Sequence, residues 1–310
     1  FIMRVSARLL EAKTSMTQRC LWYLAKISPF ALQFQSATQL NKLINITAEL
    51  ADLKREDLRF NAQEKGLVAG TILFDAPGLR ADGTKVQLLI SNDWATKPDT
   101  IQQTKIPKGA TCLVFESEST FNACVRLELW RRFPSGLVII TGKGQPSVST
   151  RAMVCAISRR CRTFICTDSS PWSLAIFMAY QHGSQALGST FACHTAVWLG
   201  LHASEAHEMR LPGLALTEAD KSCLLRLRGL FPRDGEMDED GLAKLELYRD
   251  ELNLWESLDL KWELEALIAS FAVPDGDDDA RGPYEVFGDY LVSPARDNIE
   301  SSQFHPNISS

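Results

Sequence analysis

The feature that most constrains the fold is an alternation of short apolar runs with helical stretches between residues 112 and 181. The expected strands are Cys112–Phe115, Leu137–Ile140 and Thr163–Thr167, and the expected helices are Thr120–Phe133, Val148–Arg160 and Trp172–Gln181. Short, continuously apolar strands separated by helices are typical of a parallel sheet that is buried on both faces. The order therefore predicts an α/β domain with a Rossmann-like parallel sheet.

The preceding part of the chain has a different pattern. Residues 13–60 are predicted to be helical, and two short strands, Thr71–Phe74 and Lys85–Ile90, follow around a turn at Asp82-Gly83. Helices followed by a small hairpin predict a winged-helix DNA-binding domain at residues 1–95. A polar, proline-containing linker at 96–109 would join it to the sheet domain, which we expect at 110–310.

The C-terminal part is predicted to be mainly helical. Thr217 with Asp220 three positions later resembles a capping box that opens a helix. Leu242–Phe271 has the spacing of one or two amphipathic helices, and residues 275–281 are expected to form a solvated acidic loop.

Charge is distributed unevenly along a chain whose net charge is −5. Residues 1–162 hold 23 Lys and Arg against 13 Asp and Glu, and the remaining residues hold 10 against 25, so balances of +10 and −15 sum to −5. A basic N-terminal half could follow a phosphate backbone. A dipolar surface without any partner would explain the same charges equally well.

Several classes of protein are disfavoured by the sequence. The eight cysteines form no CxxC pair and have no histidine at ligand spacing, so we expect free buried thiols in a reducing compartment and no zinc site. No apolar run approaches eighteen residues and no secretory signal is visible, so no membrane span is expected. Because the first residue is Phe1, we interpret the sequence as a fragment or a trimmed chain.

Two carboxylates follow strands of the predicted sheet. Glu116 follows the first strand and Asp168 follows the third. Ligands of parallel α/β sheets bind beyond the carboxyl ends of the strands, where the topology reverses. If the two strands are neighbours, these carboxylates could hold Mg²⁺, which prefers oxygen ligands and could neutralise a phosphate undergoing displacement. Alternatively, each carboxylate only caps the helix that follows it.

The segment Thr141–Ser147 (TGKGQPS) lies between the second strand and its helix. It lacks the spacing of a P-loop and the third glycine of a dinucleotide-binding turn. A lone Gly-Lys-Gly is usually a turn, and here it could bring backbone N–H groups and Lys143 to a DNA phosphate at a helix N-terminus.

Tyr23 is the only tyrosine in the first 179 residues, and Arg19 precedes it by one helical turn. A phenol with a pKa near 10 is a weak nucleophile at neutral pH, whereas a nearby guanidinium favours the phenolate and can bind a phosphate. The alternative is an ordinary core tyrosine beside Trp22, and spacing alone favours that alternative.

Taken together, these features resemble the family that contains the eukaryotic meiotic double-strand-break transesterase (Spo-eleven) and the A subunit of archaeal topoisomerase VI. Thr17–Tyr23 (TQRCLWY) is similar to the family signature Thr-Lys-Arg-Asp-Ile-Tyr-Tyr, whose last tyrosine is the nucleophile. Further matching stretches follow in order: Leu53–Gly70, Asp82–Val86, Phe115–Phe121, Ile140–Arg151, Asp168–Ser184, Val197–Leu201 and Lys261–Leu267.

The resemblance implies a winged-helix domain followed by a TOPRIM domain. It assigns Tyr23 and Arg19 to catalysis, Glu116 and Asp168 to Mg²⁺, and Lys65, Lys143 and Arg151 to DNA contacts. It also implies a homodimer, double-stranded DNA as substrate, a topoisomerase VI B-like partner subunit, other meiotic break-forming partners and a nuclear location. The implied reaction leaves the tyrosine on the 5′ end of each broken strand.

The sequence departs from the family pattern near the predicted site. Ser170 replaces the second Asp of an Asp-x-Asp motif, Ser173 replaces a glycine, Gln145 an aromatic residue and Cys20 an aspartate. A DNA-binding scaffold that has lost cleavage is therefore a rival to an active transesterase. A topoisomerase subunit is a third possibility, and it would need an ATPase partner because no ATP-binding motif is present.

Overall fold

The computed structural model describes residues 1–28, 36–53, 55–61, 64–72, 87–92, 104–183, 188–230, 239–272 and 282–292. Its centre is a six-stranded sheet in the order β4-β3-β6-β5-β7-β8. The strands are β3 (Leu67–Gly70), β4 (Leu88–Leu89), β5 (Thr111–Phe115), β6 (Leu137–Thr141), β7 (Arg162–Cys166) and β8 (Val197–Trp198). The last four are parallel to one another, which confirms the predicted α/β sheet. The first two are antiparallel additions at one edge.

Three helices cover the parallel strands: α6 (Glu118–Arg126), α7 (Val148–Ser158) and α8 (Pro171–Gln181). Each begins after a serine whose side chain accepts a hydrogen bond from the backbone N–H three residues later, the usual N-cap arrangement. The crossover from β5 to β6 and the crossover from β6 to β7 run in opposite directions across the sheet. Because such crossovers are right-handed, α6 and α7 lie on opposite faces.

The sheet core is continuous and apolar. All five residues of β6 are buried, as is typical of a parallel strand covered on both sides. The aromatic side chains of Trp198, Trp255, Trp262 and Tyr180 join this core from β8, from the C-terminal elements and from α8.

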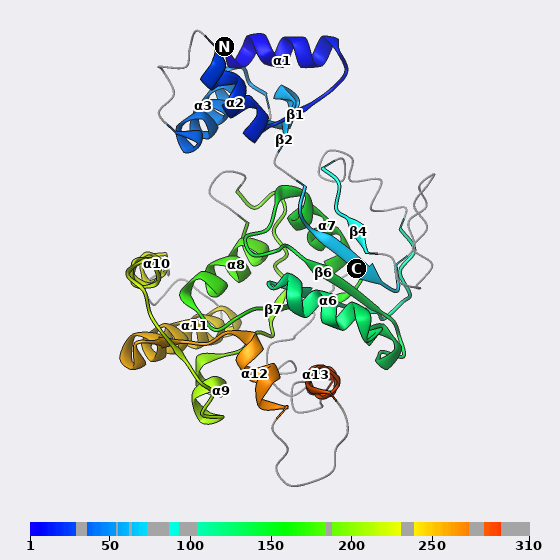
Figure 1. The fold of residues 1–310 in the computed structure, drawn as a ribbon, viewed down its shortest axis with the longest axis vertical. Helices are drawn as coiled ribbons and strands as arrows, with labels where there is room; N and C mark the ends of the chain where they lie inside the picture. The colour runs from blue at the N-terminus through cyan, green and yellow to red at the C-terminus, as the bar shows by residue number, and fades with distance from the viewer. Residues whose placement is uncertain are drawn as a thin grey trace.

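The N-terminal elements form a smaller unit with its own core. It contains α1 (Ile2–Glu11), α2 (Gln18–Ile27), α3 (Ala37–Leu50), a 3-10 turn (Arg55–Leu58) and a parallel pair of two-residue strands, β1 (Met16–Thr17) and β2 (Phe60–Asn61). Its buried side chains include Leu21, Leu40, Ile44 and Phe60. Figure 1 shows these elements grouped apart from the sheet, at the top of the view.

The predicted wing falls mainly on residues 73–86, outside the described residues. The described part of the second predicted strand does not belong to the N-terminal unit, because β4 pairs with β3 and both extend the large sheet. The sequence pattern does not predict β3, because Lys65–Gly70 only breaks the helical spacing. The winged-helix assignment and the domain limits 1–95, 96–109 and 110–310 stay predictions.

The C-terminal helices pack against α8 and α6, two of the helices that cover the sheet. They are α9 (Ala203–Glu208), α10 (Glu218–Arg228), α11 (Glu239–Leu258), α12 (Leu264–Ser270) and α13 (Pro283–Val292), and β9 (Leu214–Ala215) pairs with β10 (Leu260–Lys261). The predicted capping box of Thr217 and Asp220 is present. The stretch 242–271 contains two helices with β10 between them, whereas the predicted acidic loop at 275–281 lies outside the described residues. No helix among the described residues has the length and hydrophobicity that a membrane crossing requires.

The end of β3 gives a test of the sheet edge. Gly70 has a φ of +101°, and a Cβ there would lie 2.2 Å from the backbone oxygen of Leu137. We expect Gly70→Ala to lower the free energy of unfolding by about 2–4 kcal/mol, because both backbone strain and the collision oppose it. Gly109→Ala is the matched control, since φ is +80° but the nearest atoms lie at 3.8 Å, and it should cost about 1 kcal/mol. Denaturant unfolding of both variants measures this, and equal losses would contradict the role of the collision.

Candidate active site

Glu116 and Asp168 lie at the same edge of the sheet because their strands are adjacent and in register. Phe115, the last residue of β5, is paired with Thr141 of β6 on one side and with Cys166 of β7 on the other. Glu116 therefore leaves the central strand where the connections diverge to either side, which is the topological switch point of the sheet. The two acidic residues meet directly, since the Asp168 backbone N–H donates to Glu116 Oε2 at 3.3 Å.

The carboxylates are largely buried and carry like charges. Burial raises the pKa of Glu116, and the nearby Glu265 carboxylate adds to that effect. Burial together with the charge of Glu116 raises the pKa of Asp168 to about 7. Hydrogen bonds oppose both shifts, including one from Leu264 N–H to Asp168 Oδ1 at 2.8 Å. The arrangement keeps two anions together at a cost that a bound cation would relieve.

Glu265 is an acidic neighbour that the sequence pattern does not reveal. It lies in α12, about a hundred residues after Asp168, and it accepts hydrogen bonds from the hydroxyls of Ser117 (3.0 Å) and Ser119 (2.5 Å) at the start of α6. Its charge raises the pKa of both Glu116 and Asp168. The acidic Lys261–Leu267 stretch (KWELEAL) is the one signal for it, but no spacing rule links that stretch to strands so far away in sequence.

The donor set suits a hard divalent cation, because Glu116 and Asp168 offer carboxylate oxygens. Among the described residues, no three His, Cys, Asp or Glu side chains gather as a set of metal ligands. A cation held here would therefore take two protein carboxylates and complete its shell with water or phosphate oxygens. Glu265 is close enough for its charge to act on both carboxylates, but it would not be a ligand of the cation.

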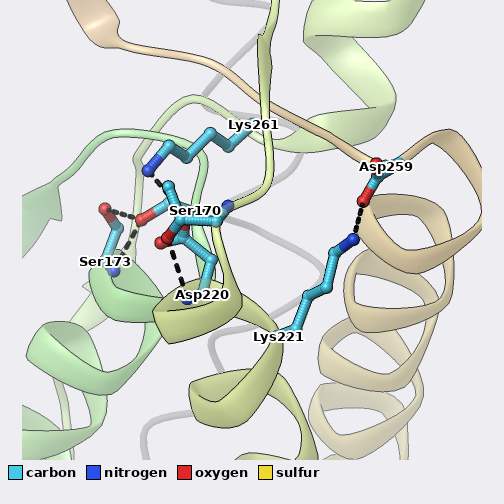
Figure 2. A network of polar contacts seen from close by, with 7 residues as sticks. Ser170, Ser173, Asp220, Lys221, Asp259 and Lys261 are labelled. Carbon is cyan, nitrogen blue, oxygen red and sulfur yellow. Dashed lines mark hydrogen bonds and ion pairs between the residues drawn. The ribbon is translucent and has the colours of Figure 1, made fainter.

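Ser170 lies next to the carboxylate pair and links to it through another serine. Its side chain is almost buried and accepts from the backbone N–H of Ser173 at 3.1 Å, which caps α8. The two hydroxyls are 2.9 Å apart (Figure 2), and the Ser173 hydroxyl also hydrogen-bonds to Glu116. The two serines that depart from the family motif are thus hydrogen-bonded to each other, and Ser173 is also hydrogen-bonded to Glu116.

Lys261 approaches the same corner from β10. The backbone of Ser169 pairs with that of Trp262, which brings the neighbouring Lys261 opposite Ser170. The Lys261 ammonium is bound to Asp220 Oδ2 at 2.7 Å, as Figure 2 shows. The pKa of the Asp220 carboxyl is lowered by this lysine and by Thr217, although its own burial opposes the shift. The negative charge of the Asp220 carboxylate is therefore neutralised by the Lys261 ammonium.

The turn after β6 places two predicted DNA contacts beside Glu116. The Gly144 N–H donates to the backbone oxygen of Glu116 at 2.9 Å, and Lys65 Nζ donates to the backbone oxygen of Lys143 at 3.2 Å. The Lys143 ammonium forms an ion pair with Glu118 at 2.7 Å, and neither side chain is fully buried. Both lysines thus contact or belong to the turn whose backbone is bound to that of Glu116, and their role towards DNA stays a prediction.

Arg151, the third predicted DNA contact, is enclosed by the protein. Its side chain is only 5% exposed, in the first turns of α7, so it does not present a freely accessible guanidinium to DNA in this structure. A sequence match cannot predict this burial, because it does not show which face of the helix is covered.

Tyr23 and Arg19 belong to the N-terminal unit, on α2. Tyr23 is 54% exposed, so the alternative of a core tyrosine is wrong. Arg19 is also exposed, one turn earlier, and the Lys26 ammonium lies 5.9 Å from the centre of the Tyr23 ring. The phenol is therefore presented on a surface with two cations nearby.

Comparison with known proteins identifies the sheet domain. Residues 111–273, more than half of the chain, match the family model of the Toprim domain shared by Spo11 and the topoisomerase 6 A subunit (TOP6A-Spo11 Toprim). The chain belongs to this family. The match begins at β5 and includes both carboxylates, the turn after β6 and Ser170, so the resemblance found in the sequence is confirmed.

Curated relatives are similar over a longer range. The meiotic recombination protein SPO11 of Mus musculus is 24% identical over 269 residues, which is 84% of this chain and 63% of the relative. The A subunit of DNA topoisomerase 6 from Arabidopsis thaliana is 26% identical over 242 residues, 76% of this chain and 54% of the relative. The A subunit of the type 2 DNA topoisomerase 6 from Aeropyrum pernix is 28% identical over 176 residues, 54% of this chain and 44% of the relative. The chain thus spans less than two thirds of these relatives.

The pKa of Asp168 gives a test of the repulsion at this Toprim edge. Between its ordinary value of 3.8 and its folded value of about 7, the folded chain binds more protons than the unfolded chain. The free energy of unfolding therefore falls as pH rises through this window. Asp168→Asn keeps the oxygen that accepts from Leu264 but loses the charge. In EDTA we expect it to be about 2–3 kcal/mol more stable than wild type at pH 8 and within about 1 kcal/mol of it at pH 4. Denaturant unfolding at both pH values measures the difference, and a difference that does not change with pH would contradict the pKa that burial and the charge of Glu116 raise at Asp168.

Proposed function

We propose that this chain breaks double-stranded DNA by transesterification, with Tyr23 as the nucleophile. The phenol oxygen forms a bond to the phosphorus, the bond from phosphorus to the 3′ oxygen breaks, and the 3′ hydroxyl leaves with a proton. The tyrosine stays on the 5′ phosphate, so no water is consumed and the ester can be reversed. The observation that carries the proposal is the pair of repelling carboxylates at the switch point of a Toprim domain of this family.

The residues around Tyr23 suit this role. Arg19 and Lys26 are cations on the same helix as an exposed phenol, where they would bind the phosphate under attack. The Thr17 side chain accepts from Cys20 N–H at 3.1 Å and fixes the first turn of α2. The nucleophile would thus be presented on a capped, regular helix.

Glu116 and Asp168 would hold Mg²⁺. The cation would supply positive charge to the phosphate as it is displaced. The protein's own contribution is to keep two carboxylates ready at one edge, with Ser173 and the Asp168 backbone N–H bound to Glu116. The raised pKa of Asp168 implies that cation binding strengthens as pH rises through about 7.

The proposed assembly rests on the family and on the names of the relatives. We propose a homodimer in which the tyrosine of one protomer works beside the carboxylates of the other. Relatives are named as A subunits of topoisomerase 6, so we propose a B-like partner subunit. Relatives named as meiotic recombination proteins support a role in starting meiotic recombination, in the nucleus and with other break-forming proteins. The winged-helix assignment of the N-terminal unit is part of the same proposal.

Covalent trapping of labelled duplex DNA tests the nucleophile. With Mg²⁺ and the required partners, wild type should retain DNA after denaturation, whereas Tyr23→Phe should form no adduct because it lacks the attacking oxygen. Tyr284→Phe is the matched control: it removes the hydroxyl of a half-buried tyrosine in α13 and should keep the adduct. Adduct formation by Tyr23→Phe would refute the assignment. No adduct with wild type would favour the rival function, a DNA-binding scaffold that Ser170 has deprived of cleavage.

Ser170 gives a test of the metal site. Ser170→Asp keeps a side chain that can cap α8 and adds a carboxylate beside the pair, so Mg²⁺ should bind equally or up to about tenfold more tightly. Ser170→Asn is the control, since it caps the helix without adding charge and should leave the affinity close to that of wild type. Calorimetric titration with Mg²⁺ measures both variants. Weaker binding by Ser170→Asp would show that residue 170 does not face the cation.

A further inference from the structure

Glu265 is attached to both segments that carry the carboxylate pair. Its side-chain oxygen Oε1 accepts from the hydroxyl of Ser117, the residue that directly follows Glu116, at 3.0 Å. The backbone N–H of Leu264, its neighbour in α12, donates to Asp168 Oδ1 at 2.8 Å. The start of α12 is therefore fixed between the end of β5 and the end of β7. From this position the charge of Glu265 acts on both members of the pair.

The Glu265 carboxylate is oriented by hydroxyl groups. The Ser119 hydroxyl donates to the same oxygen, Oε1, at 2.5 Å, and it also lies 2.6 Å from the Ser117 hydroxyl. In the described part of the chain, no hydrogen bond reaches Oε2, so this oxygen is available to a water molecule. Neutral hydroxyl donors fix the direction of a carboxylate without removing its charge.

The charge of Glu265 is also left unpaired by the cations of this edge. Lys143 forms its ion pair with Glu118 at 2.7 Å. Lys261 forms its ion pair with Asp220, also at 2.7 Å (Figure 2). Among the described residues, no lysine, arginine or histidine forms an ion pair with Glu265. A half-buried acid thus keeps its full charge beside two other acids, where a divalent cation would attract it.

This third charge compensates for one that is missing from the motif. The family pattern has an aspartate where this chain has Ser170, and the Ser170 hydroxyl is engaged with Ser173 in capping α8. Glu116, Asp168 and Glu265 together restore three negative charges to the edge. Mg²⁺ keeps several of its water ligands in proteins, and groups that bind those waters contribute to affinity without touching the metal.

We propose that Glu265 is a positioning residue for the divalent cation: it supplies the third negative charge of the site by accepting from a water ligand of the cation, in place of the charge that Ser170 lacks. The inference rests on the proposed function for what the cation does to DNA, whereas cation binding can be measured without DNA. A purely structural role, in which Glu265 only joins the starts of α12 and α6, is the alternative.

Calorimetric titration of the complete chain with MgCl₂ tests the charge. Glu265→Gln keeps an oxygen that can accept from the two serine hydroxyls but removes the charge, so Mg²⁺ should bind about tenfold more weakly than to wild type. Glu208→Gln is the charge-matched control, because it removes an exposed carboxylate at the end of α9, and it should change the affinity less than about twofold. Equal affinities of wild type and Glu265→Gln would overturn the proposal.

Two further measurements separate the charge from the hydrogen bonds. Ser119→Ala removes a hydroxyl that holds Glu265 but keeps the carboxylate, so its Mg²⁺ affinity should stay within about threefold of wild type. A loss as large as that of Glu265→Gln would show that the hydrogen bonds matter and the charge does not. In EDTA, Glu265→Gln should unfold at the same temperature as wild type or higher, since it relieves repulsion. A lower unfolding temperature with unchanged Mg²⁺ affinity is the pattern of a structural anchor.

A charge exchange tests the compensation for position 170. The double variant Ser170→Asp with Glu265→Gln restores three carboxylates, so its Mg²⁺ affinity should return to within about threefold of wild type. Ser170→Asn with Glu265→Gln is the matched control, which caps α8 without a charge and should bind as weakly as Glu265→Gln alone. If the aspartate does not strengthen binding over this control, Glu265 does not stand in for the charge missing at position 170.

The outcomes distinguish this role from the proposed function. No Mg²⁺ binding by wild type would overturn the metal site and the role of Glu265 together. Equal binding by wild type and Glu265→Gln would overturn the role of Glu265 and leave the metal site standing. Because no titration involves DNA, failure of the Tyr23 adduct would leave the inference standing, and failure of the inference would leave the adduct standing.

Discussion

The repulsion between Glu116 and Asp168 is the constraint on which the arrangement of the site depends. Two largely buried carboxylates move apart unless the surrounding structure holds them, and burial together with the charge of Glu116 raises the pKa of Asp168 to about 7. Here the register of β5 with β7 fixes their backbones, and the Asp168 N–H binds the partner carboxylate directly. The packing of the sheet core thus holds Glu116 and Asp168 together although their charges repel. Such arrangements of like charges are typical of functional sites.

The serines around this pair show how a departure from the family motif can be accommodated. Loss of an acidic residue at position 170 removes one repelling charge, and Ser170 still supplies the helix cap that an aspartate would supply. Ser173 adds a hydroxyl where the motif has glycine, and that hydroxyl supports Glu116. The two replacements therefore lie in a single hydrogen-bonded chain, which no single-position comparison of the sequence would show.

Much of the sheet could be predicted from the sequence, because buried parallel strands are short, apolar and bounded by helix caps. β5, β6 and β7 lie within a residue or two of their predicted limits, and the capping box of Thr217 is also where the sequence predicts it. β4 lies within the predicted strand Lys85–Ile90, but β3 is not predicted, since so short a strand carries little periodicity and its partner β6 lies far away in the chain. The surroundings of Glu265 and of Arg151 cannot be predicted for a related reason: tertiary packing decides which acidic groups approach one another and which arginine is enclosed.

The passage from the N-terminal unit to the sheet is short. Asn61 is the last residue of β2, and Glu64 is already attached to the sheet side, where it accepts hydrogen bonds from the Ser91 hydroxyl and the Asn92 N–H. Three peptide steps separate Asn61 from Glu64, so this connection can span at most about 11 Å. The unit that carries Tyr23 is therefore attached at a point beside the Lys143 turn. Whatever the orientation of that unit, its covalent link keeps the end of β2 within about 11 Å of Glu64.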